Sequence, residues 1–106
     1  MDVIERIQTQ VKENPVIIYM KGTPQAPMCG FSARTVEVLK QCGEEFGYVN
    51  IFADPEVYQN LPKFSEWPTF PQVFIDGELV GGCDITLELF QQGKLQDMVK
   101  QAFAKK

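Results

Sequence analysis

The spacing of apolar residues changes along the chain, and each spacing predicts a helix or a strand. The first segment carries four apolar residues at helical spacing, Val3, Ile4, Ile7 and Val11, and the residues ENP at 13–15 end it. Residues 16–20, VIIYM, form a continuous apolar run rich in β-branched side chains, which is typical of a buried strand. After a loop with two prolines and a glycine, a helix is expected from Cys29 to near Gly43.

This second helix is predicted from Phe31, Val36, Leu39 and the aliphatic part of Lys40, and a second strand is predicted over 46–52. A short helix should begin after Asp54, because Asp is a favoured N-cap and the proline that follows suits the first helical position.

Two short strands flank Asp76 and Gly77, a dipeptide that favours a two-residue hairpin turn. Asp84 is then a candidate N-cap for a helix that ends near Gly93. A last helix is predicted after it, with four residues on one apolar face, Leu95, Met98, Val99 and Phe103.

The predicted order, α-β-α-β-α-β-β-α-α, joins a βαβ unit to a ββα unit. Such a chain is expected to form one α/β domain over residues 1–106, with a small mixed sheet and helices on both faces. Cys29 then lies after the first strand, at the N-terminus of the second helix. That is the edge of an open α/β sheet where ligands bind.

Composition narrows the function classes. A net charge of −4 argues against general binding to nucleic acids or to anionic membranes. No apolar run approaches the roughly 20 residues that span a bilayer, and the N-terminus lacks the features of a secretory or transit signal. The protein is therefore expected to be cytoplasmic, or organellar if a presequence was removed.

The three cysteines, Cys29, Cys42 and Cys83, are an odd number in a chain without an export signal, which fits a reducing compartment. The chain has no histidine, so an imidazole base and a Cys/His zinc site are excluded. One chain also cannot supply the four thiolates that usually hold an iron–sulfur cluster.

Cys29 is the candidate reactive residue. The free amides and the dipole of a helix N-terminus favour its thiolate, and Lys21 can add a positive charge. The flanking Pro27, Gly30 and Ser32 argue against a buried, inert cysteine. Ser32 stands where a second thiol would resolve a mixed disulfide, so resolution needs an external thiol such as glutathione. In the simpler interpretation, Ser32 only caps the helix.

Two further motifs follow, WPTFPQ at 67–72 and GGCD at 81–84. Either the first is a simple turn, or a cis bond before Pro71 leaves the Phe70 backbone free to pair with an extended peptide. In the second, two glycines precede amides that can bind an anion, and Asp84 is either an N-cap or an acceptor for an ammonium group. The tripeptide glutathione has a thiol, a peptide backbone, carboxylates and an ammonium group to match.

These residues together resemble the monothiol, CGFS-type glutaredoxins in their short single-domain form, through YMKG, TPQAPMCGFS and WPTFPQVFIDGELVGGCD. The resemblance implies a thioredoxin fold with a four-stranded mixed sheet and a cis Pro71. It implies that four residues bind glutathione, Lys21, Phe70, Cys83 and Asp84. Trp67, Pro68 and the longer loop over 23–27 accompany weak or absent oxidoreductase activity in that family.

The resemblance also implies a [2Fe–2S] cluster held between two protomers by the two Cys29 thiolates and two glutathione thiolates. Such a protein is a homodimer when loaded and a monomer when free of the cluster. It passes the cluster to apo iron–sulfur proteins and pairs with BolA-like proteins.

One position departs from the family pattern. Relatives often carry an arginine where Tyr58 aligns, and this arginine reaches the glycine-end carboxylate of glutathione. Tyr58 offers one hydrogen bond and no charge, and Lys63 is the candidate substitute. Cys42 is expected to be structural, or else a site of oxidation. Cys83 is expected to act through its backbone, although its sulfur could form a disulfide with Cys29.

Three hypotheses remain open at this point. Cys29 is a metal ligand in a cluster carrier, a nucleophile in a glutathione-dependent oxidoreductase, or a redox sensor in an interaction module. Ser32 is compatible with the first two, because removing glutathione from a protein needs one thiol.

Overall fold

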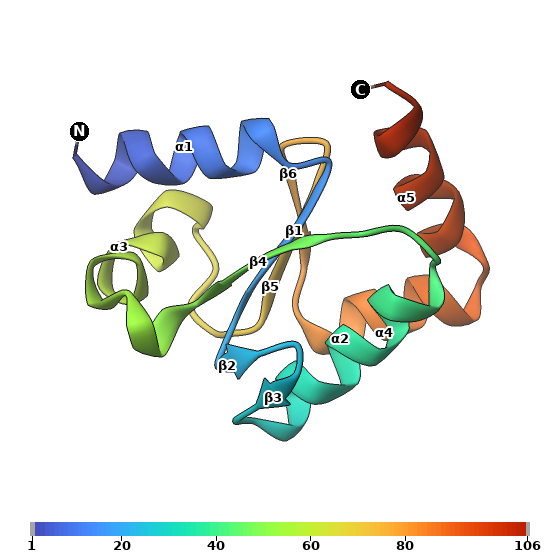
Figure 1. The fold of residues 1–106 in the computed structure, drawn as a ribbon, viewed down its shortest axis with the longest axis horizontal. Coiled ribbons are helices and arrows are strands. Elements are labelled where there is room, and N and C mark those ends of the chain that lie inside the picture. The colour runs from blue at the N-terminus through green and yellow to red at the C-terminus, as the bar shows by residue number, and fades with distance from the viewer. Residues whose placement is uncertain (1, 106) are drawn as a thin grey trace.

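A computed structural model describes residues 2–105 (Figure 1). Its elements follow the chain in this order: α1 (Val3–Glu13), β1 (Val16–Met20), β2 (Gly22–Thr23), β3 (Ala26–Pro27), α2 (Gly30–Gln41), β4 (Gly47–Asn50), a 3-10 turn (Ile51–Ala53), α3 (Pro55–Ser65), β5 (Gln72–Ile75), β6 (Glu78–Gly81), α4 (Cys83–Gln91) and α5 (Lys94–Ala104).

The main sheet has four strands in the order β4-β1-β5-β6. β1 pairs in parallel with β4 and antiparallel with β5, and β5 pairs antiparallel with β6. The register sets Tyr19 opposite Gln72, so both strands reach the same end of the sheet there. This mixed sheet, with helices on both faces, confirms the predicted thioredoxin fold.

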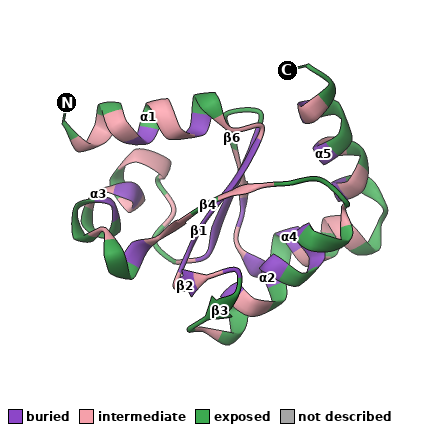
Figure 2. Ribbon diagram, in the orientation of Figure 1, coloured by how far each residue is buried: buried purple, intermediate pink, exposed green. Residues whose placement is uncertain are grey.

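The two faces of the sheet carry separate apolar cores. α2, α4 and α5 cover one face, and α1 and α3 cover the other (Figure 1). All five residues of β1 are buried, as Figure 2 shows for this central strand. Alternate β1 side chains therefore enter opposite cores: Ile18 packs with the α2 side, and Ile17 packs with the α1 side.

Local capping explains where several elements begin and end. Asp54 accepts a hydrogen bond from the Val57 N–H at 3.3 Å and caps α3, whose first residue is Pro55. Asp76 and Gly77 both have positive φ, 55° and 80°, as the predicted hairpin turn requires. These sequence predictions are confirmed.

Two predicted details are wrong. The strand expected over 46–52 ends at Asn50, because the Asn50 side chain accepts from the Phe52 N–H and starts the 3-10 turn. Asp84 is not an N-cap, since α4 begins at Cys83 and Gly82 occupies the capping position. The predicted helix after Cys29 is present as α2, and Phe31 on its first turn is 56% exposed.

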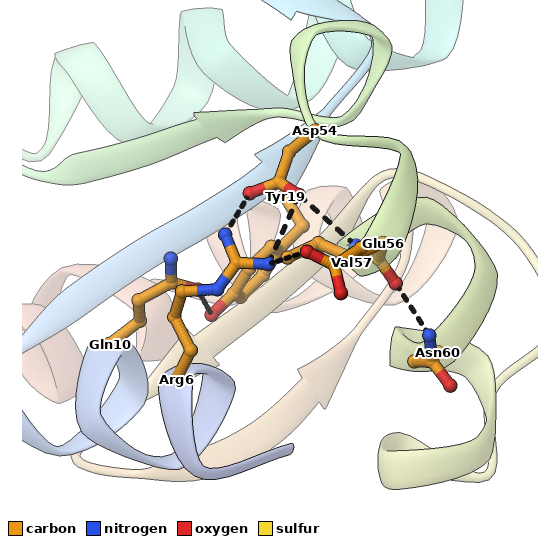
Figure 3. A network of polar contacts seen from close by, with 7 residues as sticks. All are labelled: Arg6, Gln10, Tyr19, Asp54, Glu56, Val57 and Asn60. Atoms are coloured by element: carbon orange, nitrogen blue, oxygen red, sulfur yellow. Dashed lines mark hydrogen bonds and ion pairs between the residues drawn. The ribbon is translucent and has the colours of Figure 1, made fainter. Parts of the chain in front are cut away.

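A polar network joins α1 to α3 outside the apolar core (Figure 3). Arg6 forms ion pairs with Asp54 and with Glu56. In the same region the Tyr19 hydroxyl donates to Gln10 Oε1 at 2.8 Å. Burial raises the pKa of Tyr19, so this hydroxyl stays protonated and keeps its role as a donor. Within residues 2–105, no helix has the length and apolar character needed to cross a membrane.

Candidate functional site

A cavity of about 780 Å³ opens at the end of the sheet where β1 finishes and β5 begins. Five separate segments of the chain form its wall. These are Lys21 after β1, Cys29 and Phe31 at the start of α2, Tyr58 and Pro62 of α3, residues 67–71, and residues 82–85.

Cys29 lies at the N-cap of α2 in an extended conformation, next to the free N–H groups of the first helical turn. The pKa of this thiol lies below its ordinary value, mainly because the backbone N–H of Ser32 stabilises the thiolate. The N–H of Phe31, the charge of Lys21 and the Ser32 hydroxyl act in the same direction, and partial burial opposes them. The site therefore favours an anionic sulfur in the cavity wall.

Ser32 does not cap the helix, because Cys29 holds the N-cap position of α2 and Ser32 is the third helical residue, so the simpler interpretation of the sequence is wrong. Its side chain is fully buried, and its Oγ accepts a hydrogen bond from the Lys21 N–H at 3.2 Å. The hydroxyl proton stays available to stabilise the Cys29 thiolate. Ser32 thus joins the end of β1 to the start of α2 and adds a donor near the sulfur.

The loop before Cys29 is held by hydrogen bonds at both of its ends. The Met28 N–H donates to the Lys21 carbonyl at 2.8 Å, and the Gly22 N–H donates to Asn50 Oδ1 at 3.1 Å. Gly22 has a φ of +95°, and a Cβ there would lie 2.6 Å from the Ala26 carbonyl oxygen. The β2–β3 hairpin therefore needs glycine at this position.

The opposite wall is the segment 67–71. Its Phe70–Pro71 peptide bond is cis, which confirms one of the two alternatives for this motif. Phe70 precedes the first residue of β5, so its backbone lies beyond the paired part of the sheet. The rings of Phe70 and Tyr58 pack edge to face with centroids 5.4 Å apart, which links this wall to α3.

The N-terminus of α4 forms the third side. Gly82 is its N-cap and offers no side chain to the first amides of the helix, whose N–H groups have no helical partner. A Cβ on Gly82 would lie 3.3 Å from the Pro71 carbonyl oxygen and 3.4 Å from Trp67 Nε1. Cys83 is buried, whereas Asp84 is exposed in the first turn, where its charge favours a cation.

The structure brings together six of the seven candidate binding residues at this cavity: Lys21, Cys29, Tyr58, Phe70, Cys83 and Asp84. Lys63 is exposed and does not line it. Lys21 and Asp84 are the two charged side chains in the wall, so a ligand meets one positive and one negative group.

Sequence reasoning missed the apolar part of the wall. Phe31 and Ile85 are 56% and 38% exposed, yet they line the cavity beside Cys29 and the α4 N-terminus. Both stand next to polar motif residues, and this adjacency is the one signal that could have indicated their role.

Cys42 lies away from the cavity. It is half-buried against the core on the α2 side, and its Sγ donates to the Val38 carbonyl at 3.4 Å. Burial raises the pKa of the Cys42 thiol. These features agree with the structural role expected for Cys42.

Among residues 2–105, no cluster of three or more His, Cys, Asp or Glu side chains could hold a metal ion. Cys29 is a soft thiolate donor at an open cavity, so it fits a site in which other molecules supply the remaining ligands. The donor set of this chain is therefore compatible with a shared iron–sulfur cluster.

Comparison with known proteins gives concordant matches. Residues 16–80 match the family model described as Glutaredoxin. Glutaredoxin 4 of Escherichia coli strain K12 is 55% identical over 102 residues, covering 96% of this chain and 89% of that protein.

Two solved structures are similar over most of the chain. The solution structure of reduced poplar apo GrxS14 has a TM-score of 0.82 and 43% identity, and the match covers 94% of this chain and 92% of that one. The crystal structure of the buckwheat glutaredoxin–glutathione complex has a TM-score of 0.84 and 26% identity, with 95% and 90% covered.

Proposed function

The chain belongs to the glutaredoxin family, and we propose that it binds glutathione at Cys29 and carries a [2Fe–2S] cluster shared by two protomers. The observation that carries this proposal is a stabilised Cys29 thiolate in a peptide-sized cavity, with Ser32 three residues on. A single thiol cannot complete a dithiol cycle, but it can serve as one of several thiolate ligands.

Glutathione would lie across the cavity with its thiol beside Cys29. Lys21 and the free amides at the α4 N-terminus would hold its two carboxylates, and Asp84 would accept from its ammonium group. The Phe70 backbone would pair with the peptide, and Cys83 would contribute its N–H. The similarity to a glutaredoxin crystallised with glutathione supports this assignment.

Tyr58 borders the same cavity and would replace a charged contact with one hydroxyl and an aromatic wall. Lys63 is left out of the proposed site because it does not line the cavity. With one cation in the wall, the affinity for glutathione is expected to depend strongly on Lys21.

The cluster would be the cargo of the protein. Two Cys29 thiolates and two glutathione thiolates would complete its four ligands, so the loaded form is a homodimer and the free form a monomer. Apo iron–sulfur proteins and BolA-like proteins are the proposed partners, and a reducing compartment such as the cytoplasm is the proposed location.

A second candidate is glutathione-dependent reduction of mixed disulfides, which the lowered pKa of Cys29 favours. The Cys29 thiolate would attack the glutathione sulfur of a protein mixed disulfide and release the protein thiolate. A second glutathione thiolate would then attack the glutathione bound to Cys29. This step releases glutathione disulfide and returns the Cys29 thiolate. Redox sensing by an interaction module is the third candidate.

The test is anaerobic reconstitution with iron, sulfide and glutathione, followed by visible absorption, circular dichroism and gel filtration. The proposal expects a [2Fe–2S] spectrum on a dimer that needs glutathione and is lost in Cys29→Ser. Cys42→Ser is the matched control, because Cys42 lies outside the cavity. This variant should load the cluster as the unmodified protein does.

Two results would reject the carrier. One is the absence of a cluster under conditions that load an established carrier. The other is equal loading of Cys29→Ser and the unmodified protein. Turnover of a glutathione mixed disulfide by a protein that loads no cluster would favour the oxidoreductase.

A further inference from the structure

Gln72 is a fully buried polar side chain directly behind the wall formed by residues 67–71. It is the first residue of β5, and it does not line the cavity. Its Nε2 donates to the Trp67 carbonyl at 2.8 Å and to the Thr69 carbonyl at 3.1 Å. One amide group therefore holds two carbonyls of the cavity wall.

The wall has few other ways to be held in place. Pro68 and Pro71 have no N–H to donate, and the segment precedes the first paired residue of β5. A backbone segment without ladder hydrogen bonds depends on side chains or water to satisfy its carbonyls. For Trp67 and Thr69 that role falls to Gln72.

The two acceptors require a donor with two hydrogens at this position. The amide nitrogen of glutamine supplies both hydrogens. A carboxylate or an apolar side chain would supply none, so both carbonyls would lose these hydrogen bonds. The amide oxygen, Gln72 Oε1, is buried and has no hydrogen-bond partner among residues 2–105. A buried acceptor without a partner lowers the stability of the fold. The two hydrogen bonds that Gln72 Nε2 donates to the wall offset this cost.

The wall also contacts the N-terminus of α4. The Pro71 carbonyl and Trp67 Nε1 lie so close to Gly82 that a Cβ there would be 3.3 Å and 3.4 Å from them. The position of residues 67–71 therefore sets how far the wall stands from the free amides of α4. Moving the wall would change the width of the cavity between Phe70 and that helix.

We propose that Gln72 is a positioning residue for the bound peptide: its amide fixes the 67–71 wall against the α4 N-terminus. The inference rests on the proposed binding of glutathione, and it adds a residue that touches no ligand. Removing the amide frees the wall to move, so the peptide must order the wall when it binds and binding becomes weaker.

The experiment compares Gln72→Met, which keeps the length of the side chain and removes both donors, with Val99→Ala. Val99 is buried in the core on the α5 side and does not line the cavity, so Val99→Ala destabilises the fold without touching the wall. Three quantities are measured: the urea midpoint, the dissociation constant for glutathione by calorimetry, and the acrylamide quenching of Trp67. Trp67 is the single tryptophan of the chain, so its fluorescence reports on the wall alone.

Gln72→Met is expected to bind glutathione roughly tenfold more weakly, since two hydrogen bonds that order the wall are lost, and Trp67 should become more accessible to quencher. Val99→Ala should lower the urea midpoint while leaving both other quantities unchanged. Unchanged affinity and quenching in folded Gln72→Met would overturn the proposal. Equal weakening of binding in the two variants would overturn it as well, because stability alone would then explain the loss.

If Gln72→Met does not fold, Gln72→Asn gives the same comparison, because its shorter amide cannot reach both carbonyls. If the unmodified protein binds no glutathione, the proposed function fails. Quenching of Trp67 still tests whether Gln72 holds the wall, because that measurement needs no ligand.

Discussion

Cys29 takes its reactivity mainly from the backbone around it, because this chain contains no histidine that could activate a thiol. The N–H groups of Ser32 and Phe31, in the first turn of α2, favour the thiolate, and the charge of Lys21 adds to them. Backbone donors at a helix N-terminus are in place before any ligand arrives. The resulting anion suits both metal ligation and nucleophilic attack.

This origin of the thiolate predicts the pH dependence of its alkylation. The rate with iodoacetamide should fall as the pH decreases through the pKa of Cys29, with a midpoint below the ordinary value of about 8.5. Lys21→Met and Ser32→Ala should both move the midpoint upward, since each removes a group that lowers the pKa. To measure the midpoint, the alkylation reaction is stopped after set times at a series of pH values. Mass spectrometry then quantifies the modified peptide that contains Cys29.

Cys42 provides the internal control in the same samples. Burial raises the pKa of its thiol, so at a given pH it should react more slowly than Cys29. A Cys29 midpoint at or above about 8.5, or faster modification of Cys42, would contradict a thiolate stabilised by the α2 N-terminus.

The residues expected to react with or bind a ligand were predictable because their spacing in the sequence indicates where helices begin. Cys29 after a strand and the two glycines before Cys83 indicate a helix N-terminus from sequence alone. Gln72 and the tie between Ser32 and Lys21 were not predictable in this way. Their hydrogen-bond partners are backbone atoms of other segments. The order of side chains in the sequence does not indicate where such backbone atoms lie in the fold.

At the scale of elements, the rotation of α3 decides which of its side chains meet the ligand. Val57 and Leu61 are fully buried, which fixes the inward face of the helix. Tyr58 and Pro62 follow them by one residue, about 100° around the helix, and line the cavity. Lys63 lies a further 100° or so around, away from the cavity, which explains why this candidate is absent from the wall.

Asp54 is expected to set the position of α3 through two separate contacts. Its carboxylate caps the helix by accepting from the Val57 N–H, and it pairs with Arg6 of α1 (Figure 3). Asp54→Ala removes the cap and the ion pair, and loss of such a cap costs about 1 kcal/mol. Asp54→Asn keeps a capping oxygen and loses the charge, so it should cost less. Urea unfolding of the two variants measures the difference.

Glu56→Gln is the matched control for the charge. Glu56 pairs with the same Arg6, but its side chain is 74% exposed, and exposed pairs contribute little. This variant should change the free energy of unfolding by no more than a few tenths of a kcal/mol. Equal losses in Asp54→Asn and Asp54→Ala would show that the ion pair, and not the cap, holds α3.

Element types were more predictable than element boundaries. Periodicity distinguishes the β1 run from the helices on either side of it, whereas the hydrogen bonds of one side chain decide where β4 ends. Asn50 stops β4 by accepting from two N–H groups, those of Gly22 and Phe52. The β2 and β3 strands were expected to be loop, because strands of two residues are too short to show any alternation.

At the scale of the molecule, the sheet separates two cores, and the cavity lies where one end of the sheet meets parts of both helical layers. α2 and α4 reach it from one face, and α3 reaches it from the other. The architecture was predictable because the order of elements and the right-handed crossover between β1 and β4 restrict the topology. The composition of the cavity wall was not, because it joins segments up to 64 residues apart in the chain, from Lys21 to Ile85.

The two cores should also behave independently when mutated. Ile7 of α1 and Ile18 of β1 are both fully buried, but they belong to clusters on opposite faces of the sheet. Ile7→Val and Ile18→Val should each cost about 0.5–1.5 kcal/mol. Their costs should add in the double variant to within about 0.5 kcal/mol, because they share no packing partners. Ile7→Val combined with Ile17→Val, in the same cluster, is the comparison expected to show coupling. Urea unfolding of all the variants tests this, and strong coupling across the sheet would mean that β1 transmits strain between its two faces.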